Sequence, residues 1–303
     1  MTNLSVSGVV ALLLFVFCLP VFALDDFGEI DVYKLSGSSE LNYSGYISLG
    51  FGWDSEDSND YFVDLEVDLP SQIQFLFSAN LYKSDVDFNA DESKNYVVGL
   101  FNDPDEFWIL GLEYDYYKEQ NLYTIDAFRL TAGVNLGGWA LKFIPQRRLI
   151  NGEFRILNRM LTLAGTSTGY GGEVEYIGHD SWNLQLAYHK YQYEGNELFD
   201  RLLDLKPSQD NILLDRKRSI LAGIEDNRWT FSTNYLFEWG SVGFDWVRSV
   251  GIGVSADIAF IYMLSVSTFV TESLAIDLDV GSLTVSNDND YLIFSTLSLT
   301  YFW

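Results

Sequence analysis

Cysteine, proline, histidine and basic residues are all scarce in this sequence. Its 303 residues include one Cys, five Pro and two His, and 18 Lys and Arg stand against 43 Asp and Glu. A single cysteine excludes a disulfide framework and a zinc site built from several thiolates. A formal net charge of -25 argues against nucleic acid as a partner, because that needs a basic surface. The 16% aromatic content excludes intrinsic disorder.

The N-terminus has the features of a targeting segment. Residues 1–23 carry no charged side chain, and Val9 to Leu19 is an apolar run too short to span a membrane as a helix. The run is followed by Val21-Phe22-Ala23, which fits the small-residue rule for signal-peptide cleavage. We therefore expect a signal peptide over 1–23, a short tail or plug over 24–40, and the main domain over 41–303.

Beyond this segment the dominant pattern has period two. No later stretch of about 20 residues is continuously apolar. Over 229–239, one face is mostly aromatic and the other mostly polar: Trp229, Phe231, Thr233, Tyr235, Phe237 and Trp239 alternate with Thr230, Ser232, Asn234, Leu236 and Glu238. The same alternation over 64–69, 73–81 and 182–189 predicts an all-β chain of amphipathic strands.

The spacing of turn signals separates two all-β architectures. Tight turns are predicted at Pro70-Ser71-Gln72, Asp103-Pro104-Asp105, Gly137-Gly138, His179-Asp180, Asp226-Asn227 and Thr271-Glu272. About 31 to 47 residues lie between successive turns, enough for two strands and a longer loop. Short turns at one end and longer loops at the other are typical of a transmembrane barrel, whereas period two alone would also suit a soluble sandwich.

The map that results is an antiparallel, up-and-down transmembrane β-barrel of about fourteen strands. Strands that leave the turns are expected near 41–52, 73–83, 107–117, 139–147, 181–193, 228–240 and 274–286. Returning strands are expected near 60–69, 93–102, 124–136, 168–178, 218–226, 254–269 and 291–303. Because 148–167 could hide another hairpin, twelve or sixteen strands remain alternatives.

Tryptophan is placed as an aromatic girdle would require. Four Trp residues closely follow a predicted turn and a fifth ends the chain: Trp108, Trp139, Trp182, Trp229 and Trp303. Three others, Trp53, Trp239 and Trp246, fall near the opposite ends of their hairpins. Indole prefers the membrane–water interface, so two girdles flanking an apolar band favour a lipid-facing barrel.

The last strand carries a family resemblance. Residues 291–303 alternate and close on an aromatic residue, with Leu297, Leu299, Tyr301 and Trp303 on one face. This resembles the C-terminal strand of Gram-negative outer-membrane β-barrel proteins, although these usually end in Phe. The resemblance implies location in the bacterial outer membrane and insertion by the barrel assembly machinery through that strand. Monomeric fourteen-stranded porins are architectural analogues by size and strand count alone.

The predicted inward face is strongly acidic. The acidic residues predicted to face inward are Asp64, Glu66, Asp68, Glu113, Asp115, Glu173, Glu175, Asp257, Asp277 and Asp279. The strands that carry Asp64 and Asp277 are three apart around a closed ring of fourteen, so their acids should form one wall. A wall of carboxylates raises the local concentration of cations. Alternatively, these carboxylates are merely solvated or paired and have no transport role.

Basic residues are fewer and have two possible positions. The candidates are Arg129, Lys142, Arg147, Arg148, Arg155 and Arg159. Arg129 and Lys142 are expected inside the barrel. The four others cluster at a predicted loop over 148–167, which either folds inward as a constriction or contacts lipopolysaccharide phosphates in the outer leaflet.

These features favour an outer-membrane, porin-like channel for passive diffusion of small hydrophilic solutes, with a preference for cations. The alternative is a non-conducting barrel with a structural, adhesive or envelope-export role. We expect no enzyme, because His189 has no accompanying Ser motif. No cofactor or metal site is predicted, since the acidic run 85–91 departs from a calcium loop at Ala90. The expected partners are outer-membrane lipid, lipopolysaccharide and small solutes, and a monomer is the default.

Overall fold

The computed structural model describes residues 44–55, 58–69, 73–84, 91–102, 107–119, 123–156, 159–177, 181–195, 224–252, 258–286 and 291–303. The chain divides into two units, 1–41 and 42–303, and every described residue belongs to the second unit. The predicted signal peptide and the tail or plug over 24–40 therefore lie outside the described residues. No helix in the described ranges is long and apolar enough to cross a membrane.

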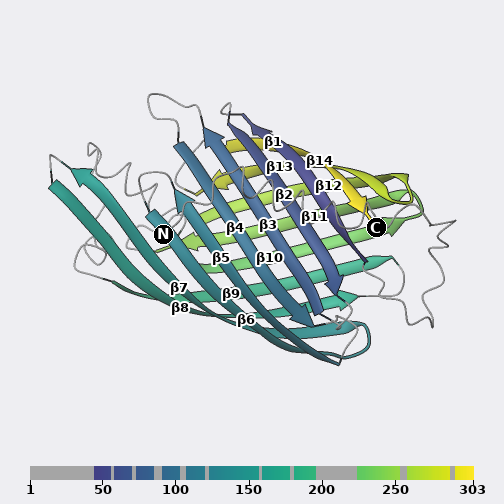
Figure 1. The fold of residues 1–303 in the computed structure, drawn as a ribbon, viewed down its shortest axis with the longest axis horizontal. Helices are drawn as coiled ribbons and strands as arrows, with labels where there is room; N and C mark the ends of the chain where they lie inside the picture. Colours follow the sequence, from purple (N-terminus) through teal and green to yellow (C-terminus); the bar gives the residue numbers. More distant parts are fainter. Residues whose placement is uncertain are drawn as a thin grey trace, which may run out of the picture. The chain divides into compact units, whose positions relative to one another are not determined.

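Fourteen antiparallel strands close into a single barrel (Figure 1). They are β1 (Ser44–Asp54), β2 (Asn59–Leu69), β3 (Ile73–Ser84), β4 (Asp91–Asn102), β5 (Trp108–Glu119), β6 (Tyr123–Asn135), β7 (Trp139–Ile156), β8 (Arg159–Ile177), β9 (Trp182–Gly195), β10 (Glu225–Phe237), β11 (Gly240–Gly251), β12 (Ile258–Thr271), β13 (Leu274–Val285) and β14 (Tyr291–Phe302). Each strand pairs with its neighbours in sequence, and β1 pairs with β14. The predicted fourteen-stranded, up-and-down barrel is confirmed.

The two ends of the barrel differ. The connections β2–β3, β4–β5, β6–β7, β8–β9, β10–β11 and β12–β13 lie at one end, together with the start of β1 and the end of β14. We call this end the turn end and the opposite one the loop end. Gly137 and Gly138 in the β6–β7 turn have φ of 66° and 102°, a region that favours glycine. The predicted turns at Gly137-Gly138 and Thr271-Glu272 lie at the turn end, and those predicted at 70–72, 103–105 and 179–180 lie outside the described residues.

The sixth predicted turn, Asp226-Asn227, is wrong. Both residues lie inside β10, where the ladder with β11 shifts register between Glu225 and Asn227. Such a bulge accommodates residues with turn composition without ending the strand. The actual turn is 238–239, so the predicted strand over 228–240 runs in the opposite direction, and β11 was not predicted. Residues 218–223 of another predicted strand lie outside the described residues.

The predicted loop over 148–167 is also wrong. Most of it continues β7 and β8, which at 18 and 19 residues are the longest strands of the barrel. Figure 1 shows the two strands projecting together beyond their neighbours. The pairing of β6 with β7 stops at Gly152, and that of β8 with β9 stops at Gly165, so the remainder is a free-standing two-stranded hairpin. It therefore supplies no inward-folded constriction.

Strand alternation divides the barrel into an apolar exterior and a polar interior. In β5, Trp108, Leu110 and Leu112 are 63%, 57% and 52% exposed on the outside. Their neighbours Glu113 and Asp115 face the interior, across from Arg129 and Ala127 of β6. The same two-residue period continues around the ring, because paired residues on adjacent strands share a face.

Interior glycines seat aromatic rings against the barrel wall. A Cβ atom built on Gly50 would overlap the Phe62 ring, one on Gly169 the Tyr191 ring, and one on Gly171 the His189 ring. The rings therefore occupy space that a side chain on the adjacent strand would need. Small residues at these positions let the rings lie flat on the wall instead of crossing the lumen.

We expect Gly171→Ala to destabilise the barrel by roughly 1–3 kcal/mol, the usual cost of overpacking, because the new methyl group displaces the His189 ring. Gly172→Ala is the matched control, since its Cβ would lie 4.0 Å from the Lys142 carbonyl oxygen and meet nothing closer. Urea-unfolding midpoints of the two variants in detergent micelles would test this difference. Equal destabilisation by both changes would contradict the seating of His189 on Gly171.

Candidate functional site

The interior of β5 to β9 carries carboxylates that are ion-paired. Arg129 of β6 bonds Glu113 and lies 2.7 Å from Asp115, both on β5. Lys142 of β7 lies 2.7 Å from Glu173 and 2.8 Å from Glu175 on β8. Each cation thus holds two acids of one neighbouring strand, which reduces the charge of this side of the lumen.

Interior side chains also pack closely on this side. Tyr123, Ile125, Ile150 and Tyr191 are each less than a tenth exposed although they face the lumen. Arg148 lies over the Tyr191 ring, with 3.9 Å from its guanidinium carbon to the ring centroid. We call β5 to β9 the packed half of the lumen.

Gln146 joins this cluster. With its amide oriented for hydrogen bonding, its oxygen accepts from Nε of Arg148 at 3.1 Å and from Nε of Arg129 at 3.2 Å, and its nitrogen donates to the Tyr191 hydroxyl at 3.3 Å. One nearly buried amide therefore ties β6, β7 and β9 together across the interior.

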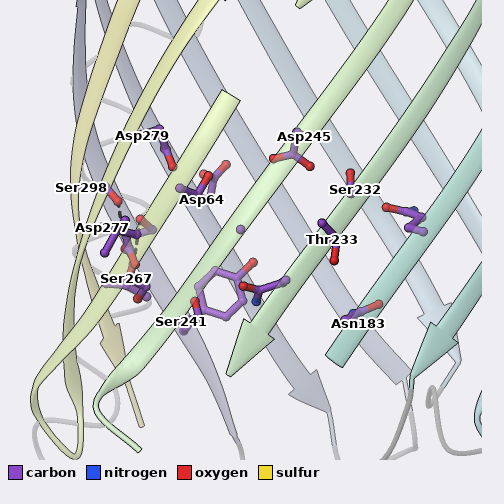
Figure 2. Close-up of a pocket in the computed structure, with 18 of the residues that line it drawn as sticks. Asp64, Asn183, Ser232, Thr233, Ser241, Asp245, Ser267, Asp277, Asp279 and Ser298 are labelled. Atoms are coloured by element: carbon purple, nitrogen blue, oxygen red, sulfur yellow. Dashed lines mark hydrogen bonds between the residues drawn. The ribbon is translucent and has the colours of Figure 1, made fainter. Parts of the chain in front are cut away.

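Of the nine remaining strands, β10 to β14 with β1 and β2 enclose a cavity of about 510 Å³ that extends to β9, whereas β3 and β4 do not line it. We call this region the open half. Four aspartates line the cavity: Asp64 on β2, Asp245 on β11, and Asp277 and Asp279 on β13. Figure 2 shows Asp64, Asp277 and Asp279 grouped on one side, with Asp245 facing the same space from β11, which β12 separates from β13. Ser232, Ser241 and Ser267 are among the hydroxyls that complete the lining.

The acids of the open half have neutral partners. Asp277 accepts hydrogen bonds from the hydroxyls of Ser298 at 3.0 Å and Thr300 at 2.8 Å. Lower on the same wall, the Gln74 amide donates to Glu66 at 2.9 Å and to Asp68 at 3.3 Å. Among the described residues, no Lys or Arg forms an ion pair with any of the four cavity aspartates. This half of the lumen therefore keeps a net negative charge.

The placement of the predicted site residues is uneven. Asp64, Glu66, Asp68, Glu113, Asp115, Glu173, Glu175, Asp277, Asp279, Arg129, Lys142 and Arg148 have interior positions in the ladder, and Arg147 has an exterior one. Of the acids predicted to form one wall, Asp64, Asp277 and Asp279 line one cavity, and Glu66 and Asp68 are not among its lining residues. Asp257 lies outside the described residues. Arg155 and Arg159 belong to β7 and β8, but their side chains are outside the described part.

Asp245 is the one aspartate of this cavity that the sequence did not predict. It was missed because β11 was not predicted. Its signal is present in 241–246, where Val242, Phe244 and Trp246 alternate with Ser241, Gly243 and Asp245. The false turn at 226–227 displaced the strand boundaries and concealed this alternation.

Aromatic residues form the rim at the turn end. Trp108, Trp139 and Trp182 begin β5, β7 and β9, and Trp303 ends the chain, all of them at least 40% exposed. Trp229 does not belong to this rim, because it lies within β10 and pairs with Tyr188 and Arg248. Trp239, in the β10–β11 turn and 50% exposed, takes its place.

Within the described barrel wall, below the β7–β8 hairpin extension, the outward-facing basic residues lie at a similar height. The described Lys and Arg residues whose ladder positions face outward are Lys83, Lys94, Lys118, Arg147, Lys190 and Arg248. Each lies eight positions from the turn-end residue of its strand (β4, β7, β9, β11) or ten positions from it (β3, β5). At about 3.4 Å per residue and a strand tilt of roughly 40°, this places them about 20–26 Å above the turn end. We call these six residues the basic belt.

The fold and the site define an architectural class: a closed fourteen-stranded barrel with an apolar exterior, aromatic rims and a polar, partly hollow interior. No protein-family model matches the sequence, and neither does any curated protein.

Several solved structures resemble the barrel. A loop-deletion mutant of OmpT, an outer membrane protein of Vibrio cholerae, has a TM-score of 0.47 at 8% identity, over 87% of this chain and 99% of that one. Pseudomonas aeruginosa OpdK with vanillate has a TM-score of 0.43 at 9% identity, over 86% and 98%. The KdgM porin, in complex with disordered oligogalacturonate, has 0.42 at 10%, over 84% and 98%. No value reaches 0.5, so function is argued below from the site itself.

The ion pairs of the packed half lead to a stability prediction. Arg129→Met leaves Glu113 and Asp115 largely buried without their cation, so we expect a loss of roughly 1–3 kcal/mol in the free energy of unfolding, the cost of an unsatisfied buried polar group. Neutralising both acids in the triple variant Arg129→Met/Glu113→Gln/Asp115→Asn should restore most of it. Chemical unfolding followed by tryptophan fluorescence would measure both. A triple variant as unstable as the single one would show that Arg129 acts through packing instead.

Proposed function

We propose that the protein is a bacterial outer-membrane channel for passive diffusion of small hydrophilic solutes, with a preference for cations. One observation carries the proposal: the barrel interior holds a cavity of about 510 Å³ lined by four aspartates and by hydroxyl and amide side chains. Fixed carboxylates between low-dielectric walls concentrate cations and repel anions.

The exterior supports the membrane part of this proposal. Exposed apolar side chains such as Leu110, Phe143 and Leu264, each more than half exposed, would be costly in water over so large an area. A lipid-facing barrel needs an apolar band about 25 Å tall between aromatic rims. The spacing from the turn end to the basic belt is close to that height. The turn end is then the periplasmic side, where bacterial barrels have their short turns and both termini.

Export and assembly complete the proposal. A signal peptide cleaved after Ala23 would direct the chain out of the cytoplasm, and β14, which ends at Trp303, would be recognised by the barrel assembly machinery. The basic belt would lie at the outer leaflet and contact lipopolysaccharide phosphates, with which guanidinium forms bidentate, charge-assisted hydrogen bonds. The proposal has the protein act as a monomer, with no catalytic residue and no cofactor. The alternative remains a non-conducting barrel with a structural, adhesive or export role.

Conductance tests the channel directly. In planar bilayers under a salt gradient, we expect steady single-channel currents with a preference for cations. The variant Asp277→Asn/Asp279→Asn should lower the cation-to-anion permeability ratio by roughly twofold or more, because two of the four cavity charges are removed. Glu194→Gln is the control, since it removes an exposed carboxylate at an exterior ladder position of β9. Folded protein that never conducts would refute the channel and favour the alternative.

Two adjacent arginines provide a test of contact with lipopolysaccharide. Arg147 and Arg148 are adjacent but point to opposite faces of β7, outward and into the packed half. We expect Arg147→Gln to reduce the lipopolysaccharide retained by the purified protein severalfold, and Arg148→Gln to leave it unchanged. Phosphate content per protein, measured after washes of increasing ionic strength, would show the difference. Equal retention by both variants would exclude a role for Arg147 in binding lipid phosphate.

A further inference from the structure

A second, smaller cavity lies at the loop end, where β1, β2, β3 and β14 meet. It has a volume of about 200 Å³. Asp54 lines it from the end of β1, Ser58 from the β1–β2 connection, Asp60 from β2, Tyr82 from β3 and Thr296 from β14. We call it the loop-end cavity. It shares no lining residue with the larger acidic cavity.

Asp54 and Ser58 hold the edge of this cavity in a defined conformation. The Ser58 backbone N–H donates to Oδ1 of Asp54 at 3.0 Å, and the Asp54 N–H donates to the Ser58 carbonyl at 3.2 Å. The Tyr82 hydroxyl donates to Oδ2 of Asp54 at 3.1 Å. The carboxylate and the Ser58 hydroxyl are therefore positioned by backbone contacts and by a residue two strands away.

Two oxygens at the cavity have no hydrogen-bond partner. The Ser58 side chain is 1% exposed, and its hydroxyl has no partner in the described structure. Oδ1 of Asp60 is likewise buried and without a partner, while Oδ2 accepts from the Asn80 amide at 3.2 Å. Burying such groups unpaired costs about 1–3 kcal/mol each, and more for a charged oxygen. Oxygens left in this state next to a cavity can be completed by a bound cation or by water.

The donor set restricts the ligand. The lining residues offer carboxylate, hydroxyl and carbonyl oxygens and include no His or Cys. Zinc and copper prefer the nitrogen and sulfur ligands of those two residue types, so neither metal suits this cavity. Hard oxygen ligands suit Ca²⁺ and Mg²⁺, and Ca²⁺ tolerates an irregular set of six to eight ligands, whereas Mg²⁺ demands a near-ideal octahedron. The volume has room for an ion and several waters at about 30 Å³ each.

We propose that the loop-end cavity binds one Ca²⁺ ion through Asp54, Asp60 and the Ser58 hydroxyl, with water filling the remaining positions. The described residues contain no metal site built from three or more Asp, Glu, His or Cys side chains, and the proposed site has only two carboxylates. It should therefore bind Ca²⁺ weakly, with a dissociation constant of about 10⁻⁴–10⁻³ M, as in extracellular calcium modules. A bound ion would link β1 to β2 next to β14, where the barrel closes.

Terbium luminescence tests the site in the purified, full-length protein in detergent micelles. Tb³⁺ replaces Ca²⁺ at oxygen sites, and Tyr82, hydrogen-bonded to Asp54, is close enough to sensitise its emission. We expect sensitised emission that Ca²⁺ displaces and equimolar Mg²⁺ does not. Asp60→Asn should weaken Ca²⁺ displacement by at least about tenfold, because one charged ligand is lost. Ser58→Ala should weaken it severalfold, and it provides a second test if Asp60→Asn does not fold.

Asp64→Asn is the matched control. It removes the same charge from the same face of β2 but lies in the larger cavity. Unchanged Ca²⁺ affinity in this variant supports a specific site. Equal weakening by Asp60→Asn and Asp64→Asn would mean diffuse attraction of cations to an acidic barrel and would overturn the proposal. Absence of Ca²⁺-displaceable emission in the unmodified protein would overturn it too, and would indicate that water completes Ser58 and Asp60. Neither readout depends on conductance, so failure here leaves the channel proposal standing.

Discussion

The pairing of β1 with β14 is the contact on which the rest of the structure depends. An open sheet of fourteen strands would leave two edges of unpaired N–H and C=O groups, and an apolar environment offers no water to form hydrogen bonds with them. The seam is reinforced inside by a buried hydrogen bond between the Thr300 and Ser48 hydroxyls at 3.0 Å, which spans 252 residues of sequence. Residues that pair across a ladder point to the same face of the sheet. In a closed barrel, each strand therefore determines which residues of the next strand point into the lumen.

Much of the fold could be predicted because successive residues of a barrel strand point alternately to the exterior and to the lumen, so that apolar and polar side chains alternate in the sequence. Most strand positions, the antiparallel order and the interior position of acids such as Asp64 and Asp277 follow from alternation and turns, although the predicted total of fourteen included 218–226 and lacked β11. The wrong turn and the wrong loop have one source. Turn signals depend on a few adjacent residues, whereas strand pairing depends on residues far apart in the sequence. Asp226 and Asn227 look like a turn, yet Lys190 on β9 forms an ion pair with Asp226, and the ladder between β10 and β11 continues past it to Glu225. Residues 148–167 lack strong alternation, but cross-strand pairing keeps most of them in β7 and β8.

The charge pattern of the lumen was harder to anticipate. Alternation predicts that Glu113, Asp115 and Arg129 all face inward, but not that they meet. They meet because the β5–β6 register places Glu113 directly opposite Arg129. Lys142 stands opposite Glu173 for the same reason. Cross-strand register depends on turn length and bulges, which sequence patterns locate only to within a few residues. The division into a packed and an open half is therefore a property of register, and composition alone suggested a uniformly acidic interior.

That division has a mechanical consequence. The packed half is braced by side chains that reach between strands, with Gln146 joining β6, β7 and β9 and with Arg129 and Lys142 tying pairs of strands. Around the large cavity, β10 to β14 with β1 and β2 face hollow space, so backbone ladders and short hydroxyl contacts such as Thr300 to Asp277 hold their shape. Fluctuations that change the cross-section of the lumen should therefore be concentrated in these seven strands. The barrel has one stiff side and one compliant side, and the cavity lies on the compliant one.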